Sequence, residues 1–153
     1  LQLVARVPPI DASRNGPRLL LIHIEAARSS RLKTAWLLWR HYRRLRLHHE
    51  DPVVPILFLP RGGPSGVERV PVREEHEGFE VASFTYWALG LAKLEARDHL
   101  DRNALAPALA ACMRSRDWSK AEHKHRCLER ILTLDLDTAR SFLLVDAVET
   151  YIH

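Results

Sequence analysis

Cysteine is scarce in this sequence, and long apolar runs are absent. Its two cysteines, Cys112 and Cys127, lack the spacing of metal ligands, which argues against both a disulfide framework and a cysteine-based metal site. No stretch approaches the roughly 18 consecutive apolar residues that a membrane span requires. The first residues, LQLVARVPP, lack the charged-then-apolar order of a signal peptide. We therefore expect a cytoplasmic protein with no membrane partner.

The chain also lacks a starting methionine, and its last residues, TYIH, carry no helix-ending signal. We expect both ends to continue in a longer protein. Hydrophobic residues make up 46% and charged residues 27% of the 153 positions, which is typical of a globular domain with one core. The net charge of +4 comes from an excess of arginine. It favours a nucleic-acid partner, although a solvated basic surface would have the same composition.

Hydrophobic patterning predicts an α/β fold. Residues 1–7 and 18–25 are β-rich and are separated by a turn-forming stretch, so they form a hairpin. Residues 30–49 have helical periodicity, with an apolar stripe at Leu32, Trp36, Trp39, Tyr42 and Leu45. The apolar run VVPILFLP then predicts a buried strand, which makes the helix a crossover connection.

The remaining segments predict a loop, a further strand and a helical region. Residues 60–78 read as a loop with a short strand at VERVPV, and the acidic EEHE run within it as solvated loop. FEVASFTYW predicts a strand, and the signals after residue 92 are helical, with Asp137 as a helix N-cap. We expect an α/β core over residues 1–92 and a helical extension over residues 93–153 that packs on the core within the same domain.

Glu25 is the candidate catalytic carboxylate. In a hairpin whose loop centres near Ser13, paired residue numbers keep a constant sum, which places Val7 opposite Leu20 and Gln2 opposite Glu25. A charge at the end of an apolar strand is costly unless a ligand or partner uses it. It suits a metal site, because Mg²⁺ binds carboxylate oxygens and can activate water. Alternatively, Glu25 pairs with Arg28 or another basic side chain at the sheet edge.

Five blocks of the sequence resemble the recombination-promoting nuclease (Rpn) family, whose members are also named after transposases and belong to the PD-(D/E)XK nuclease superfamily. The blocks follow the order of that family and cover most of the chain: LVARV, LLLIHIEAARSS, WRHYRRLR, DPVVPILFLP and NALAPALAACMR. The resemblance implies a bacterial, metal-dependent DNA endonuclease involved in recombination. It also implies a restriction-endonuclease-like mixed sheet flanked by helices.

The sequence departs from the family motif at two of three positions. The family has an Asp on the first hairpin strand and a Glu-x-Gln or Glu-x-Lys on the second. Glu25 matches the Glu, whereas Gln2 stands at the Asp position and Ala27 at the Gln/Lys position. A neutral amide is a weaker Mg²⁺ ligand than a carboxylate, and alanine cannot stabilise a transition-state charge. We therefore expect little cutting activity. Asp11 cannot substitute, because it lies at the far end of the hairpin.

DNA contact is expected from basic residues that follow Glu25 into the helix and would hold phosphates without reading sequence. These are Arg28, Arg31, Lys33, Arg40, Arg43 and Arg44. Some of them could instead form surface ion pairs.

Other features favour structural roles. His23 could offer a metal a nitrogen ligand, although such a histidine more often makes a structural hydrogen bond. His123 and Cys127 are four residues apart on one helix without a second matching pair. Trp36 and Trp39 fit a core better than a base-stacking surface, because they belong to the apolar stripe.

Three functional hypotheses remain open. The preferred one is a nuclease-fold domain with an impaired centre that retains DNA binding or subunit interaction, including self-association. The second is an active endonuclease, with Mg²⁺ or another divalent cation, that upstream or partner residues complete. The third is a non-catalytic protein-interaction module in which the basic helix and the C-terminal helices make the contacts.

Overall fold

The computed structural model describes residues 2–7, 20–27 and 32–152. The chain divides into two compact units, Leu1–Gly90 and Leu91–His153, each with its own buried apolar cluster. The division lies two residues before the expected limit of the α/β core. The expected packing of the helical region on that core stays a prediction.

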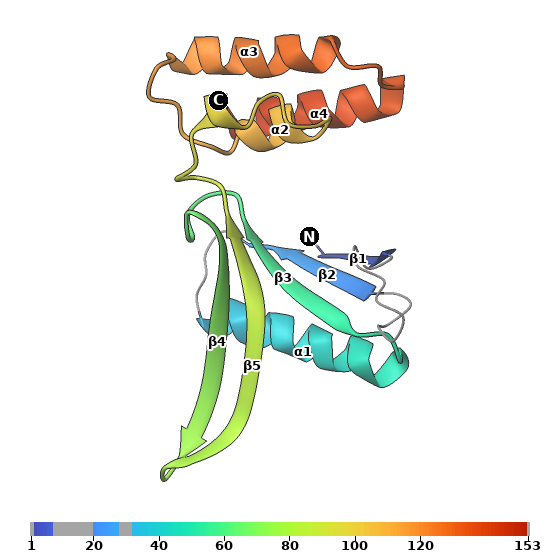
Figure 1. Cartoon of the computed structure of the whole chain (residues 1–153), viewed down its shortest axis with the longest axis vertical. Helices are drawn as coiled ribbons and strands as arrows, with labels where there is room; N and C mark the ends of the chain where they lie inside the picture. Colours follow the sequence, from blue (N-terminus) through green and yellow to red (C-terminus); the bar gives the residue numbers. More distant parts are fainter. Residues whose placement is uncertain (1, 8–19, 28–31, 153) are drawn as a thin grey trace. The chain divides into compact units, whose positions relative to one another are not determined.

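The first unit is a mixed β-sheet with one helix across a face, which confirms the α/β class (Figure 1). The strand order is β1-β2-β3-β5-β4. Strands β2, β3 and β5 run parallel to one another, and β1 and β4 are antiparallel edge strands. The elements are β1 (Gln2–Val7), β2 (Leu20–Ala26), α1 (Leu32–His48), β3 (Val53–Leu59), β4 (Gly66–His76) and β5 (Phe79–Gly90).

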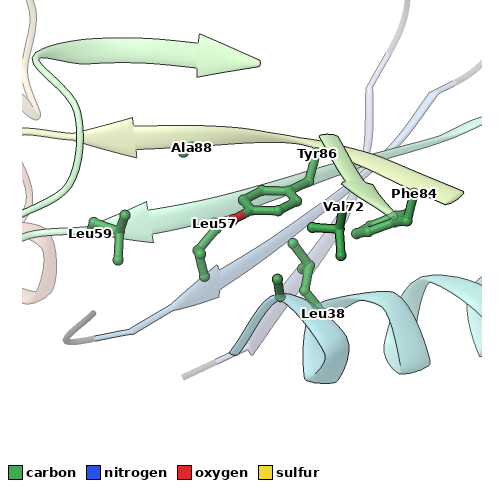
Figure 2. Packing of buried hydrophobic residues seen from close by; sticks show 8 residues of the cluster. Leu38, Leu57, Leu59, Val72, Phe84, Tyr86 and Ala88 are labelled. Atoms are coloured by element: carbon green, nitrogen blue, oxygen red, sulfur yellow. The ribbon is translucent and has the colours of Figure 1, made fainter. Parts of the chain in front are cut away.

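Helix α1 packs on the sheet through small and branched side chains. Ala35 and Leu38 are its buried residues, and they belong to one cluster with Leu57, Phe84 and Tyr86 (Figure 2). The expected stripe was therefore wrong in part. Leu32 is 63% exposed, and the two tryptophans are only partly buried at the margin of the cluster. The small side chain of Ala35 allows the helix to approach the sheet closely, which turns the larger residues toward its flanks.

Strands β4 and β5 form a long hairpin rather than a loop and a short strand. The pairing runs from Gly66↔Gly90 to His76↔Phe79, so Glu74, Glu75 and His76 belong to β4, and the loop expected for the acidic run was wrong. Glu77 and Gly78 form the two-residue turn with φ angles of 49° and 83°, as the tightest hairpin turns require. Strand β3 pairs with β5 only from Trp87 to Gly90. Beyond that point the hairpin is a two-stranded ribbon (Figure 1).

Gly90 closes the base of the hairpin. A Cβ atom at this position would clash with the backbone carbonyl oxygen of Pro64 and lie 2.9 Å from the Pro64 nitrogen and 3.0 Å from the Gly62 carbonyl oxygen. The loop between β3 and β4 therefore rests directly on the backbone of β5. Only glycine leaves room for this approach.

The second unit contains four helical segments around a separate core. They are η1 (Ala96–Asp98), α2 (Ala106–Ala110), α3 (Lys120–Leu132) and α4 (Thr138–Tyr151). The Asp137 side chain accepts a hydrogen bond from the Arg140 N–H, which confirms the predicted N-cap, and Ser119 caps α3 in the same way. Buried residues from these segments include Ala110, Cys127, Ile131 and Val148.

Residues 94–115 are less helical than expected. Segments 94–100 and 103–115 contain only η1 and the five-residue α2. The Asn103 side chain accepts a hydrogen bond from the Leu105 N–H, an Asx-type turn that competes with helix at this point. Pro107 lies in the first turn of α2, where proline is tolerated, and therefore limits how far this helix can extend toward the N-terminus.

Within the described residues, no helix combines the length and the apolar character needed to cross a membrane.

Candidate functional site

The two N-terminal strands have the predicted register. Gln2 is the direct partner of Glu25, and Val7 is the direct partner of Leu20. Glu25 is also level with Leu57 of the parallel strand β3. Directly opposed residues of an antiparallel ladder belong to the same face of a sheet, so the first two positions of the expected motif are neighbours. The side chains of Gln2 and Glu25 lie outside the described part of the structure.

The third motif position immediately follows β2. The Ala27 N–H donates a hydrogen bond of 2.9 Å to the Phe58 carbonyl oxygen, and its methyl group packs against the margin of the core. This bond holds the chain at the carboxyl end of β2, beside the ends of the parallel strands β3 and β5. Ligand sites of open α/β sheets lie at the carboxyl ends of parallel strands. Ala27 brings no polar side-chain atom to this place.

Glu68 of β4 is level with Glu25 but too distant to bind one cation together with it. Glu68 of β4 pairs with Ala88, and Ala88 pairs with Leu57, which is level with Glu25. The separation of three strand spacings is about 14 Å, too far for two carboxylates to share one cation. Glu68 instead acts on Tyr86, whose pKa is raised first by burial and second by this carboxylate.

His23 is fully buried beneath α1. It pairs with Pro55 of β3 and Val4 of β1, and its ring meets that of His41 edge-on with centroids 5.9 Å apart. Among the residues whose side chains are described, no group of three or more His, Cys, Asp or Glu could hold a metal ion. The burial of His23 and its ring contact with His41 agree with a packing role. Its contact with His41 was not foreseen, because periodicity does not identify which helical residue meets a given strand residue.

Helix α1 carries cations without acidic partners. Among the described residues, no carboxylate forms an ion pair with Lys33, Arg40, Arg43 or Arg44, and all four are exposed. The Arg43 guanidinium lies 4.9 Å from the centroid of the Trp39 ring. Arg28 and Arg31 lie outside the described residues.

These cations border an apolar depression, which we call the outer groove of α1. It has a volume of about 390 Å³ and is lined by Trp36, Trp39, Arg40, Arg43, Arg44 and Leu47. A neighbouring depression of about 520 Å³ continues it toward Lys33 and Leu37 and shares Trp36 and Arg40. Trp36 and Trp39 meet at nearly right angles with ring centroids 5.0 Å apart. Both tryptophans therefore contribute to the core margin and to the surface. One signal in the sequence could have predicted this groove, namely the helical spacing of Trp36, Arg40, Arg43 and Leu47.

The His123 and Cys127 pair of α3 belongs to the core of the second unit. His123 Nε2 lies 3.1 Å from the Ala110 carbonyl oxygen, to which it donates as the Nε2–H tautomer. Burial lowers the pKa of His123, although the Ala110 bond and Glu95 oppose that shift. Burial, with a smaller contribution from Cys112, raises the pKa of Cys127 to about 12. A buried neutral imidazole and a protonated thiol are structural groups.

No protein-family model, curated protein or solved structure matches this chain.

Proposed function

We propose that the first unit is a nuclease-like domain of the PD-(D/E)XK type that binds DNA and has an impaired metal centre. The observation that carries this proposal is the direct pairing of Gln2 with Glu25 near the carboxyl ends of the parallel strands. The resemblance of five sequence blocks to the Rpn family supplies the chemistry expected at that place. The finer fold assignment, the bacterial origin and the link to recombination belong to the same proposal.

The available donors are a poor fit for a catalytic divalent cation. Mg²⁺ takes six ligands in near-ideal octahedral geometry and prefers carboxylate oxygens. The motif positions offer one carboxylate at Glu25, one neutral amide at Gln2 and no side-chain donor at Ala27. Glu68 is too distant to help. We therefore assign no hydrolytic step to this chain and propose that its role depends on binding.

DNA binding is supported by the cations of α1. An arginine already neutralised by a carboxylate gains little from a phosphate, whereas Lys33, Arg40 and Arg44 have no such partner among the described residues. Exposed cations along one face of a helix can follow a phosphate backbone. Such contacts would position DNA without selecting its sequence.

Salt-dependent binding tests this proposal. A fluorescein-labelled duplex is titrated with the purified chain at several salt concentrations, and binding is followed by anisotropy. The slope of log K against log salt is about −0.9 for each phosphate contact. The variant Lys33→Ala/Arg40→Ala/Arg44→Ala should reduce the magnitude of that slope by about 2 to 3.

The matched control replaces three exposed basic residues of the second unit, as Lys93→Ala/Arg102→Ala/Lys120→Ala. It removes the same charge and should leave the slope unchanged. Absence of binding at low salt would contradict the proposal, as would equal losses in the two variants.

A protein-interaction role is the second candidate, and the composition of the outer groove favours it. Leu47 is 77% exposed and lies beside two tryptophans. Phosphate contact alone does not call for exposed leucine. An active endonuclease completed by other residues is the third candidate, and it requires Glu25: cutting that survives Glu25→Ala cannot come from this centre.

A further inference from the structure

The outer half of the β4–β5 hairpin is an isolated ribbon, which we call the hairpin arm (residues 73–83). The last buried pair before it is Val72↔Phe84, which lies against Tyr42 of α1. Beyond this pair every arm residue except Ala82 is exposed, and β5 pairs only with β4. An isolated two-stranded hairpin is marginally stable in water. An arm of this length is therefore expected to gain order from a partner.

The arm combines acidic and apolar groups. It contains four glutamates, Glu74, Glu75, Glu77 and Glu80, against one arginine, Arg73. Phe79 is 75% exposed and Val81 is 61% exposed.

A β-bulge determines which face Phe79 occupies. Pairing passes from Glu74↔Ala82 to Glu75↔Glu80, so Val81 is the extra residue of β5. A bulge shifts the alternation of its strand by one residue. Glu74 and His76 are two residues apart on β4, so they lie on the same face of the arm. Phe79 pairs with His76 and therefore shares that face with Glu74. An aromatic anchor and a carboxylate therefore belong to the same face of the arm.

The outer groove of α1 has the complementary composition. Two tryptophans and Leu47 form its apolar part, and Arg40, Arg43 and Arg44 surround it without acidic partners among the described residues. An acidic surface with an exposed aromatic side chain would bury apolar area against the groove and neutralise its charge. Aromatic residues and arginines are the groups that most often dominate protein interfaces.

Among the described residues, no hydrogen bond, ion pair or ring contact joins the arm to the groove of the same chain. Leu38 points into the sheet, and Leu47 follows nine residues later, about two and a half helical turns at 3.6 residues per turn. Leu47 therefore lies on the side of α1 opposite the sheet, and the groove runs from there to Trp36 and Trp39 at the margin of the core, whereas the arm continues the sheet itself (Figure 1). The contact of Phe84 with Tyr42 holds the base of the arm on α1 and restricts its movement toward the groove of its own chain. A second copy meets no such obstacle.

We propose that this chain self-associates by placing the hairpin arm of one copy in the outer groove of α1 of another. When the exchange is reciprocal, it closes a two-fold dimer, because each copy supplies one arm and one groove. Opposite charge sets the partner and its orientation, and Phe79 supplies the apolar anchor. The inference does not depend on the DNA proposal. The two compete for the same arginines.

Charge reversal tests the exchange. Sedimentation velocity of the full chain should show a mass that rises with concentration toward twice 17.6 kDa and falls at high salt, because screening weakens surface charge attraction. Glu74→Lys/Glu75→Lys in the arm and Arg40→Glu/Arg44→Glu in the groove should each weaken association by at least about 100-fold. Phe79→Ala should weaken it without changing the salt dependence.

Mixing the two reversed variants is the decisive measurement. In each variant alone, the arm and the groove carry charge of the same sign and repel each other. In a mixture, the basic arm of the first variant meets the acidic groove of the second, and the acidic arm of the second meets the basic groove of the first. A heterodimer should therefore form from two monomeric variants. The control Asp135→Lys/Asp146→Lys reverses two exposed charges of the second unit and should associate as the parent does. Circular dichroism verifies that every variant is folded.

Three results would overturn the proposal: a parent chain that stays monomeric at all concentrations, association that neither reversal weakens, or a mixture of folded variants that fails to dimerise. No nucleic acid is present in these measurements, so each of these results leaves the DNA proposal standing. Conversely, a chain that dimerises as described but ignores duplex DNA would refute only the DNA proposal.

Discussion

Gln2 lies directly opposite Glu25 in the ladder of β1 and β2, one residue before β2 ends. This relationship brings together the two positions at which a PD-(D/E)XK nuclease would carry carboxylates. In this chain one of them is an amide. The proposed catalytic consequence can be tested by substitution, because Gln2 and Glu25 already pair directly.

Restoring the motif should restore cutting. We expect Gln2→Asp/Ala27→Gln to nick supercoiled plasmid in the presence of Mg²⁺ and the parent to show little or no nicking. Each lost electrostatic contribution typically lowers a rate by about 10² to 10³, so the single variants should be intermediate or inactive. Adding Glu25→Ala to the restored chain is the control and should abolish nicking. A parent chain that nicks as fast as the restored one would refute the proposed impairment.

Leu38 should contribute strongly to stability. It is fully buried between α1 and the sheet (Figure 2), so Leu38→Ala should lower the free energy of unfolding by about 2 to 5 kcal/mol. Leu32→Ala is a matched control in the same helix, because its side chain is 63% exposed and lies outside the outer groove. The control should change stability by less than about 0.5 kcal/mol. Urea denaturation followed by circular dichroism measures both. Similar losses would contradict the packing of α1.

Gly90 should not tolerate a side chain. Gly90→Ala brings a Cβ atom against the backbone of Pro64 and Gly62, and we expect a loss of about 1 to 3 kcal/mol from the forced backbone shift. Gly78→Ala is the comparison. Its Cβ would meet no atom within 4 Å, and only the positive φ of 83° opposes it. That substitution should cost about 1 kcal/mol. Thermal unfolding of both variants measures the two losses of stability. Equal losses would contradict the predicted clash at Gly90.

The two cysteines should differ in reactivity. Cys127 is fully buried, and its thiol has a pKa raised to about 12, whereas Cys112 is partly exposed. Because the thiolate is the reactive species, iodoacetamide near pH 8 should modify Cys112 well before Cys127 in the native chain. Mass spectrometry of tryptic peptides measures each site. The difference should disappear in denaturant. Native modification of Cys127 at the rate of Cys112 would contradict its burial.

His123 should make the second unit less stable in mild acid. Its pKa in the folded chain lies below the value of 6.5 expected when unfolded. The unfolded chain therefore binds the proton more readily as the pH falls, so the stability contributed by the neutral imidazole is present above about pH 6.5 and is lost below it. His123→Gln should flatten the fall of Tm between about pH 7 and 5. His125→Gln, an exposed neighbour in α3, should leave that fall unchanged.

The N-terminal hairpin and its register could be predicted because both depend on local features. A constant sum of residue numbers gave Gln2↔Glu25 once the turn was located, and the structure confirms it. The crossover helix, the apolar strand β3 and the Asp137 N-cap follow from periodicity and side-chain chemistry in the same way. Each of these signals involves residues close in sequence, or a buried run with a clear pattern.

The β4 side of the hairpin arm escaped prediction because it has no buried face, whereas the strand predicted at FEVASFTYW is confirmed by β5. Glu74 and Glu75 are strand residues that are held by cross-strand hydrogen bonding alone, and the bulge at Val81 breaks any alternation. Composition favours a loop for such a segment. The five-residue helix α2 was overestimated for the opposite reason, because an apolar run rich in alanine resembles a long helix.

The candidate site was predicted only in its backbone. Sequence reasoning brought Gln2, Glu25 and Ala27 together and identified the cations of α1, but it assigned Trp36 and Trp39 to the core alone. These tryptophans also line the outer groove. The prediction missed the groove because Ala35 and Leu38 occupy the sheet side of the helix. Which residues of a helix face the sheet depends on how closely the two approach, and helical period alone does not determine it.

The approach of Gly62 and Pro64 to Gly90 reverses a common expectation about where a protein accepts extra residues. The segment RGGPSG has the composition of a permissive linker, yet it is clamped against β5 at the base of the hairpin. Insertions there should disturb the fold, whereas the turn at Glu77 and Gly78 is exposed and distant from the core. A reporter peptide or fluorophore therefore belongs at the tip of the arm.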